Sequence, residues 1–345
     1  FSAAFNFSAF FVVGTAVANT VAKVVNHDAE GVAVVFAALI AAITWNYLTW
    51  YIGMPSSSSH AIIGGLVGAG LAAGGLSAIN WGVVQTALIA IVVSPMLAFT
   101  VAFLAMLGLS RLQRRLTIPD DAKAFKGLQL LSAAAVSFGH GANDAQKTMG
   151  IIAAVLLAGG YITLQPDGNL QIDWWIPFLA YSAIAIGTVW GGWKIIETMG
   201  LRITSLRASS GLAANIGAVT ANVGATGMCI PISTTLAPPA AVPGSGVASG
   251  QGVNLRVVME MVAAWVVTIP STVIIGWLMY QLTQLPGVAA WIAVGSVLFV
   301  LGGWIAWAMA RALHASDVAA EIPTEEELRE PVLAIPHLEC HAPVE

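Results

Sequence analysis

Two stretches of the chain place ion-binding residue types inside otherwise apolar sequence. The first reads GMPSSSSH over residues 53–60. Pro55 cannot continue a preceding helix but suits the first turn of a new one, and the serines add hydroxyl donors to backbone N–H groups that have no partner within a helix. With the positive end of the helix dipole, these donors predict an anion site. The alternative is that the serines only bond to nearby carbonyls or pack between helices.

The second stretch, SFGHGANDAQK over residues 137–147, places a carboxylate and an ammonium group in the middle of a long apolar run. Each group costs roughly 2.5–3.5 kcal/mol to insert into a membrane, so its position implies a function. Asn143, Asp144 and Gln146 offer the hard oxygen atoms that sodium and other hard cations bind, which predicts a coupling-ion site. The alternative is an ion pair between Asp144 and Lys147 that only neutralises itself.

Together the two stretches predict coupled binding of an anion and a cation. Hydroxyl donors attract an anion, whereas the Asp144 carboxylate repels it by roughly 4 kcal/mol at about 4 Å and an effective dielectric constant near 20. Anion binding therefore requires either sodium at Asp144 or a proton on it. This charge balance is that of a symporter, and phosphate or sulfate fits the donors best. We expect Gly139 and Gly141 to permit helix unwinding and close backbone approach at this site.

Two histidines adjoin these stretches. His60 follows the serines and is either a gating or phosphate-binding group or a structural partner, and His140 is a candidate for gating or pH sensing. Glu260 follows Arg256 by one helical turn, which favours a surface ion pair over a proton relay. Ser59 and His60 are sequence neighbours that face apart on a helix, and no G-x-S-x-G motif is present. We therefore expect no catalytic residue, no resident metal or cofactor, and no enzyme.

The composition shows that a membrane must surround the elements that position these residues. Of the 345 residues, 58% are hydrophobic and 9% are charged, whereas soluble domains carry about 25% charged residues. Apolar runs of roughly 18–28 residues predict spanning helices rather than barrel strands. The low content of charged residues does not provide the basic surface that nucleic-acid binding requires. We expect an all-α polytopic protein of the cell membrane. The apolar segments are 3–25, 32–52, 82–110, 128–159, 173–193, 211–228, 253–283 and 287–311.

The loop charges predict an orientation in the membrane. The basic residues gather in two loops, with Arg111, Arg114, Arg115, Lys123 and Lys126 in one and Lys194, Arg202 and Arg207 in the other. The loop 160–173 between them has two aspartates and no base. Because cytoplasmic loops carry an excess of Lys and Arg, we expect both basic loops to be cytoplasmic. Arg311 suggests the same side for the tail that follows, which is acidic and expected to be disordered.

The chain contains two copies of one sequence pattern, about 175 residues apart. Gly53–Ser59 recurs as Gly227–Thr235, and Val92–Pro95 recurs as Val266–Pro270. The two copies are expected to lie in opposite orientations, because the first ends at a basic loop whereas the second begins beside Arg256. An inverted repeat is typical of secondary transporters.

This repeat predicts the organisation of the whole chain. We expect a first repeat at 1–110, a cytoplasmic basic linker at 111–127, a second repeat at 128–312 and the disordered tail at 313–345. The stretches 55–75 and 231–250 are too rich in Gly, Ser and Pro for ordinary spanning helices. They are expected to form two re-entrant helical hairpins in an inverted-repeat bundle.

These motifs resemble those of the inorganic phosphate transporter (PiT) family. The resemblance is carried by Phe138 with GHGANDAQK, by PSSSSH at 55–60 and by PISTT at 231–235, and it covers nearly all of 1–312. It implies an inverted-repeat fold that holds phosphate between two hairpins and two GANDxAN-like helices, with transport driven by sodium or protons. It implies that Asn143 and Asp144 serve the ion and phosphate site. The residues implied to contact phosphate or the coupling ion are Ser57, Ser58, Ser59, Ser233, Thr234 and Thr235.

The sequence departs from the family pattern in two places. The first-repeat copy of GANDxAN would lie upstream of Phe1, so we expect an N-terminal truncation. The second hairpin continues with Pro238, Pro239 and Pro243, three prolines in six residues, which we expect to prevent its second helix. Three alternatives stay open: transport of sulfate or another tetrahedral oxyanion, a transport-inactive truncated paralogue, and a homodimer in place of a monomer.

Overall fold

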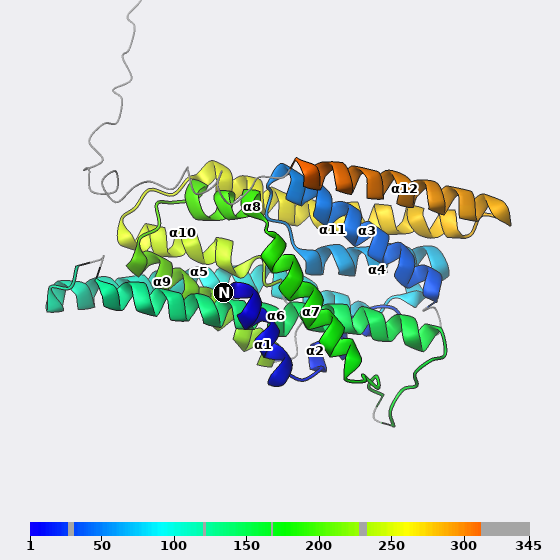
Figure 1. Ribbon diagram of the computed structural model, residues 1–345, viewed down its shortest axis with the longest axis horizontal. Helices are drawn as coiled ribbons and strands as arrows, with labels where there is room; N and C mark the ends of the chain where they lie inside the picture. The colour runs from blue at the N-terminus through cyan, green and yellow to red at the C-terminus, as the bar shows by residue number, and fades with distance from the viewer. Residues whose placement is uncertain (27–30, 120–121, 167, 228–232, 312–345) are drawn as a thin grey trace, which may run out of the picture.

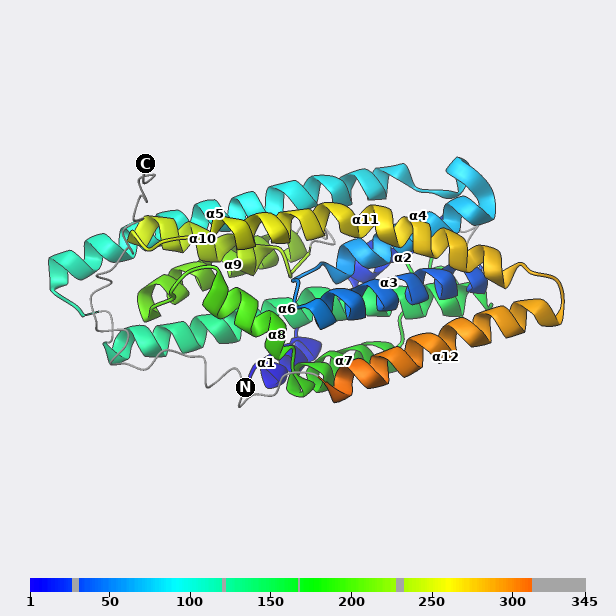
Figure 2. The ribbon, with the colours of Figure 1, turned by 90° about the horizontal axis from the view of Figure 1, so that it is seen from above.

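The computed structural model describes residues 1–311 except 27–30, 120–121, 167 and 228–232. In this part of the chain the regular secondary structure is helical, with two isolated bridges in the connecting segments. The long helices run side by side along one axis (Figures 1 and 2). Five helices are long and apolar enough to cross a membrane, and up to seven spans result if each of two bent pairs counts as one. The predicted tail 313–345 lies outside the described residues.

The first part of the chain folds differently from its apolar pattern in two places. The run predicted as one span at 3–25 is broken, since its helices meet at 92°. The stretch 55–75 is predicted to be too broken for a spanning helix, but its residues Ser58–Gly74 form one continuous helix that is capped by Ser57. The elements are α1 (Ser2–Ser8), η1 (Ala9–Phe11), α2 (Ala16–Ala22), α3 (Val32–Ile52), α4 (Ser58–Gly74), η2 (Gly75–Ala78) and α5 (Trp81–Leu116).

The second part of the chain begins with a long helix through the centre of the molecule. The predicted linker 111–127 is largely helical, because α5 continues to Leu116 and the next helix begins at Lys123. The elements are α6 (Lys123–Ala158), α7 (Trp175–Trp190), α8 (Trp193–Glu197), the π-helical turn η3 (Thr198–Arg202), α9 (Ala208–Gly227), α10 (Ala237–Ser249), α11 (Leu255–Thr283) and α12 (Val288–Ala310).

Helix α10 shows that one prediction was wrong, because the prolines do not prevent the second helix of this hairpin. Pro238 and Pro239 lie in its first turn, where the backbone N–H groups have no acceptor within the helix in any case. Only Pro243 lies inside the helix, where it removes one hydrogen bond. The helix then ends at Gly250, which adopts a left-handed conformation with φ of 76°.

Each helical hairpin packs against the long helix of the other half. Helices α3 and α4 pack on α11, whereas α9 and α10 pack on α5 (Figure 2). Glycines allow both contacts, since a Cβ on Gly68 would collide with the Val273 carbonyl and one on Gly244 would collide with the Phe99 carbonyl. These two contacts are related by the sequence repeat. The arrangement confirms the predicted inverted-repeat bundle with two helical hairpins.

Replacing either of these glycines with alanine is expected to destabilise the bundle. Gly68→Ala and Gly244→Ala each force a methyl group into a backbone carbonyl, and overpacking of this kind costs about 1–3 kcal/mol. The melting temperature of the purified protein in detergent measures the effect. Gly295→Ala on α12 is the matched control, because a Cβ there meets no atom within 4 Å. Equal melting temperatures for all three variants would contradict this packing.

Helix α6 is held in the centre by close backbone contacts with the N-terminal helices. It runs without a break through Gly139 and Gly141, so the helix is not unwound there. The close backbone approach predicted for these glycines is present at Gly141, because a Cβ there would collide with the Asn6 carbonyl of α1. One helical turn further, the Gln146 side chain accepts a hydrogen bond of 2.9 Å from the Val17 N–H of α2. These contacts fix the depth and rotation of the polar residues on α6.

Candidate functional site

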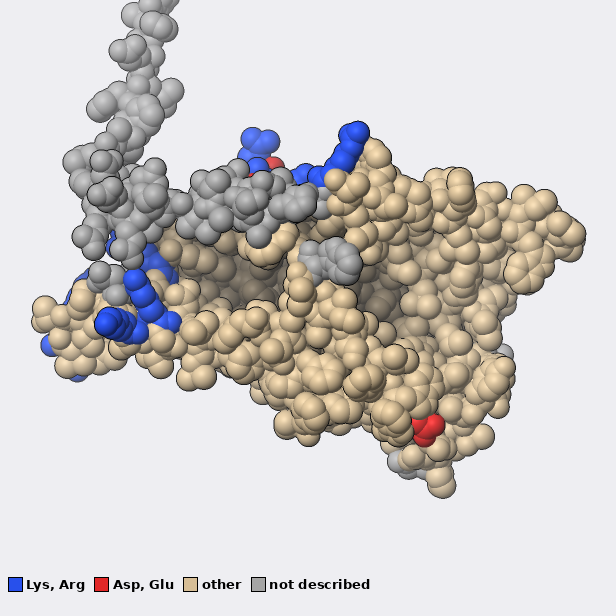
Figure 3. Space-filling model, viewed as in Figure 1, with Lys and Arg blue, Asp and Glu red and all other residues tan. Residues whose placement is uncertain are grey.

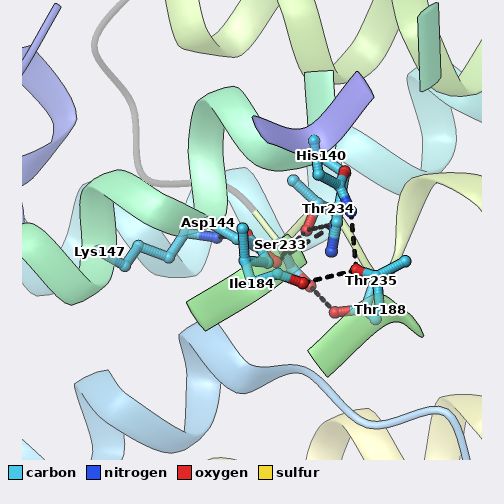
Figure 4. Close-up of polar contacts among 9 residues, drawn as sticks. His140, Asp144, Lys147, Ile184, Thr188, Ser233, Thr234 and Thr235 are labelled. Carbon is cyan, nitrogen blue, oxygen red and sulfur yellow. Dashed lines mark hydrogen bonds and ion pairs between the residues drawn. The ribbon is translucent and has the colours of Figure 1, made fainter. Parts of the chain in front are cut away.

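The second hairpin meets α6 in a compact polar cluster (Figure 4). The Thr234 hydroxyl donates a hydrogen bond of 2.7 Å to Oδ2 of Asp144. The same hydroxyl lies 3.1 Å from Nδ1 of His140, and this nitrogen is 3.3 Å from Oδ2 of Asp144. Beside it, the hydroxyls of Ser233 and Thr235 lie 3.2 Å apart. Residues 90 positions apart in sequence therefore share one site, and the Asp144 carboxylate is its centre.

Asp144 also forms an ion pair with Lys147 on the same helix. The side chains are 12% and 3% exposed, respectively, so the pair is well shielded from solvent. The sequence offered this pair as the alternative to an ion site, and the structure contains it. Thr234 and His140 approach the second carboxylate oxygen, so the ion pair is part of a larger polar cluster.

The non-helical segment between α3 and α4 is fixed by hydrogen bonds from two neighbouring segments. On one side, the Trp265 indole of α11 donates to the Pro55 carbonyl at 3.1 Å. On the other side, Lys194 donates to the Tyr51 carbonyl at 3.0 Å and Thr198 donates to the Gly53 carbonyl at 3.0 Å. The carbonyls of Tyr51, Gly53 and Pro55 thus accept hydrogen bonds from side chains of other segments. These contacts fix the position of the segment that leads into α4.

The serines of the first hairpin divide into a structural and a cavity-facing set. The Ser57 hydroxyl is buried and accepts a hydrogen bond of 3.2 Å from the His60 N–H, which caps α4. Ser56 and Ser58 instead line a cavity, and the Ser56 hydroxyl lies 3.3 Å from that of Thr268. Ser59 is buried and is not part of the cavity wall.

A cavity of about 600 Å³ brings both hairpins and α6 together. Seen from the side of Figure 1, the surface is hollowed between the upper helices and α6 (Figure 3). One part of the cavity lining comes from α6, through His140, Asp144 and Lys147. Another part comes from Ser56 and Ser58 of the first hairpin, and Thr235 lines the cavity from the second hairpin. The remaining lining residues are Asn46, Tyr47, Thr49, Trp50, Ile62, Thr148, Ala180, Ala183, Ile184, Gly187, Gly191, Ile195 and Met309.

Several predicted site residues lie behind the cavity wall instead of on it. Gln146 has both ends of its amide engaged, since its Nε2 donates to the Ala142 carbonyl at 2.8 Å and its Oε1 accepts from α2. It anchors α2, and its role as an ion ligand stays a prediction. Asn143 is fully buried, and His60 is 1% exposed with no hydrogen-bond partner for its ring nitrogens among the described residues. Neither lines the cavity in this arrangement.

The structure adds cavity residues that the sequence analysis missed. Asn46 and Thr49 come from α3, and Thr148 follows Lys147 on α6. The signal that could have found the first two is their polarity within the apolar run 32–52, spaced one turn apart. Helix α7 closes the cavity with small residues, and its Thr188 accepts a hydrogen bond of 2.8 Å from the buried Asn6 side chain of α1.

The charged residues outside the cavity lie mainly at the ends of the helices. Lys and Arg gather where α5 meets α6 and along the neighbouring edge near α8 (Figure 3). The predicted pair of Arg256 and Glu260 is present at 3.0 Å, with side chains 88% and 56% exposed. This exposure fits a surface ion pair and gives no support to a proton relay at Glu260.

Comparison with known proteins places the chain among transporters. A family model described as the phosphate transporter family matches residues 1–276. A probable low-affinity inorganic phosphate transporter of Rhizobium meliloti (strain 1021) is 44% identical over 282 residues, which cover 81% of this chain and 83% of the relative. A protein of the same description from Bacillus subtilis (strain 168) is 36% identical over 276 residues, covering 78% and 82%.

One solved structure shares the fold. It is described as the sodium-dependent phosphate transporter, and it superposes with a TM-score of 0.72 over 83% of this chain and 89% of its own. The two sequences are 24% identical. This likeness shows that the described helices adopt the same fold as that structure.

Proposed function

The chain belongs to the phosphate transporter family, and from that premise we propose that it carries inorganic phosphate across the cell membrane in symport with a cation. Membership confirms the prediction of a transporter instead of an enzyme. A single observation supports the rest of the proposal. The first hairpin, the second hairpin and the Asp144 carboxylate all face one cavity.

Phosphate is proposed to bind between the two hairpins. The N-terminus of α4 lies at the cavity, since Ser56 and Ser58 line it, and the free N–H groups and positive dipole end of a helix start favour an anion. The hydroxyls of Ser56 and Ser58 add donors from the same hairpin, and Thr235 adds one from the other. Neutral donors of this kind suit a tetrahedral oxyanion that must be released again after each transport cycle.

The coupling cation is proposed to bind at Asp144. This residue supplies the carboxylate among the residues that line the cavity, and both of its oxygens already have partners, Lys147 on Oδ1 and Thr234 on Oδ2. A sodium ion or a proton that reaches it must therefore rearrange this cluster. Because Thr234 belongs to the second hairpin, cation binding at Asp144 acts directly on that hairpin.

We also propose that the end of the molecule where α5 meets α6 faces the cytoplasm. Its concentration of Lys and Arg (Figure 3) agrees with the charge bias of cytoplasmic loops. Helix α12 ends at Ala310 next to Arg311, whose guanidinium stacks on the Trp307 ring at 4.5 Å. The tail that follows is proposed to lie on this same side.

Uptake of labelled phosphate into proteoliposomes tests the proposed function. One set of vesicles carries a sodium gradient at equal pH and a second carries a proton gradient without sodium. The gradient that drives accumulation identifies the cation. Competition by excess unlabelled sulfate then distinguishes the two candidate substrates. Hydroxyl donors alone do not separate them, but phosphate has a protonated oxygen that can donate a hydrogen bond and sulfate has none. Absence of accumulation under both gradients would contradict the proposal.

A further inference from the structure

We infer that Lys147 is a phosphate-binding residue that leaves Asp144 when a cation takes its place. This inference rests on the proposed function and assigns a role to a residue that the function did not use. Lys147 is the cationic side chain among the described lining residues of the cavity, apart from the titratable His140. Its ammonium group contacts the Asp144 carboxylate in the structure.

The charge balance of the cavity supports the exchange. With Lys147 on Asp144, the carboxylate is already neutralised and no external cation is needed to balance it. A cation that binds Asp144 leaves the ammonium group without a counter-ion in a largely buried position. An unpaired charge in such a place is strongly unfavourable. A phosphate anion in the cavity removes that penalty, so each ligand favours the binding of the other.

The geometry allows the ammonium group to serve either partner. Lys147 and Asp144 are one helical turn apart on α6, and both line the cavity that Ser58 and Thr235 also line. An ammonium group has three N–H donors on a flexible four-carbon chain. It can therefore turn from a carboxylate oxygen toward an anion in the cavity while α6 itself stays in place.

Phosphate binding to the purified full chain in detergent tests the inference at fixed pH and sodium concentration. Lys147→Met is expected to weaken phosphate binding about tenfold or more, since a hydrogen bond to a charged group contributes about 1.5–3 kcal/mol. Asp144→Asn releases the ammonium group, so this variant is expected to bind phosphate at least as tightly as the wild type and without dependence on sodium. Lys123→Met, at the exposed start of α6, is the matched control.

The double variant Asp144→Asn, Lys147→Met separates a binding role from a purely structural one. It removes both charges together and so avoids leaving an unpaired charge in the core. If Lys147 binds phosphate, the double variant binds it about tenfold or more weakly than Asp144→Asn alone. Equal affinity of these two variants would overturn the inference and leave the proposed function intact. Failure of the wild type to bind phosphate would overturn the proposed function instead.

Discussion

Asp144→Asn is expected to abolish cation-driven accumulation of phosphate. The amide keeps the size of the side chain but loses the charge that attracts a sodium ion or holds a proton. Coupling free energies between ligands are typically about 1–3 kcal/mol, so the cation should no longer tighten phosphate binding by the corresponding factor of about 5–150. Without that coupling, the cation gradient cannot drive accumulation. Labelled phosphate uptake into proteoliposomes, with the driving gradient identified for the wild type, measures the loss.

Glu260→Gln is the matched control for this change. It makes the same replacement of carboxylate by amide, but in an exposed pair with Arg256 at the start of α11, and uptake is expected to stay at the wild-type level. A melting curve and a monodisperse elution profile establish that the Asp144 variant folds, which matters because Lys147 loses its partner. A folded Asp144→Asn protein that still accumulates phosphate would refute the coupling mechanism.

Removing one hydroxyl from each hairpin is expected to produce the second-largest effect. Ser58→Ala and Thr235→Val each delete a donor that faces the cavity. Since a hydrogen bond to a charged group contributes about 1.5–3 kcal/mol, each change should weaken phosphate binding about tenfold or more. Because both hydroxyls are proposed to bind the same phosphate, their effects are not expected to multiply, but the double variant should bind more weakly than either single variant.

Hydroxyls that do not face the cavity provide the comparison. Thr220 and Ser296 donate to carbonyls of their own helices at 2.8 and 2.7 Å and lie exposed on the outer surface. Thr220→Val and Ser296→Ala should leave phosphate affinity unchanged. The concentration dependence of uptake measures all of these variants. A Ser58, Thr235 double variant with unaltered affinity would show that phosphate binds elsewhere.

The sequence predicted the architecture better than the individual helix ends. The repeat of Pro and hydroxyl residues was sufficient to predict two inverted hairpins, because each copy marks a helix start in an apolar setting. The bend of the first segment near Gly14 could not be read from hydropathy, since it depends on how α1 and α2 pack around α6. The helix at 237–249 is compatible with its three prolines because two of them lie in the first turn, so their position and not their number determines the effect on the helix.

In the candidate site, too, the residue types could be predicted from the sequence, whereas their contacts depend on tertiary packing. A carboxylate in a predicted spanning segment makes Asp144 a candidate site residue from sequence alone. Its hydrogen bond with Thr234 joins two distant motifs that each looked suited to bind ions. Gln146 looked like an ion ligand because of its amide oxygen, yet that oxygen accepts from the Val17 N–H. Only the packing of α2 on α6 determines this, and no sequence pattern encodes it.

Each hairpin packs on the long helix of the opposite half, so the final packing of the first half can form only late in synthesis. Helix α4 leaves the ribosome well before α11 exists, so its glycine-lined face must wait in the lipid or beside the insertion machinery. Helix α5 likewise waits for α10. Neither half can reach its final packing alone, and a chain interrupted before Leu255 would leave the first hairpin without its long-helix partner. Such an intermediate is a natural substrate for membrane quality control.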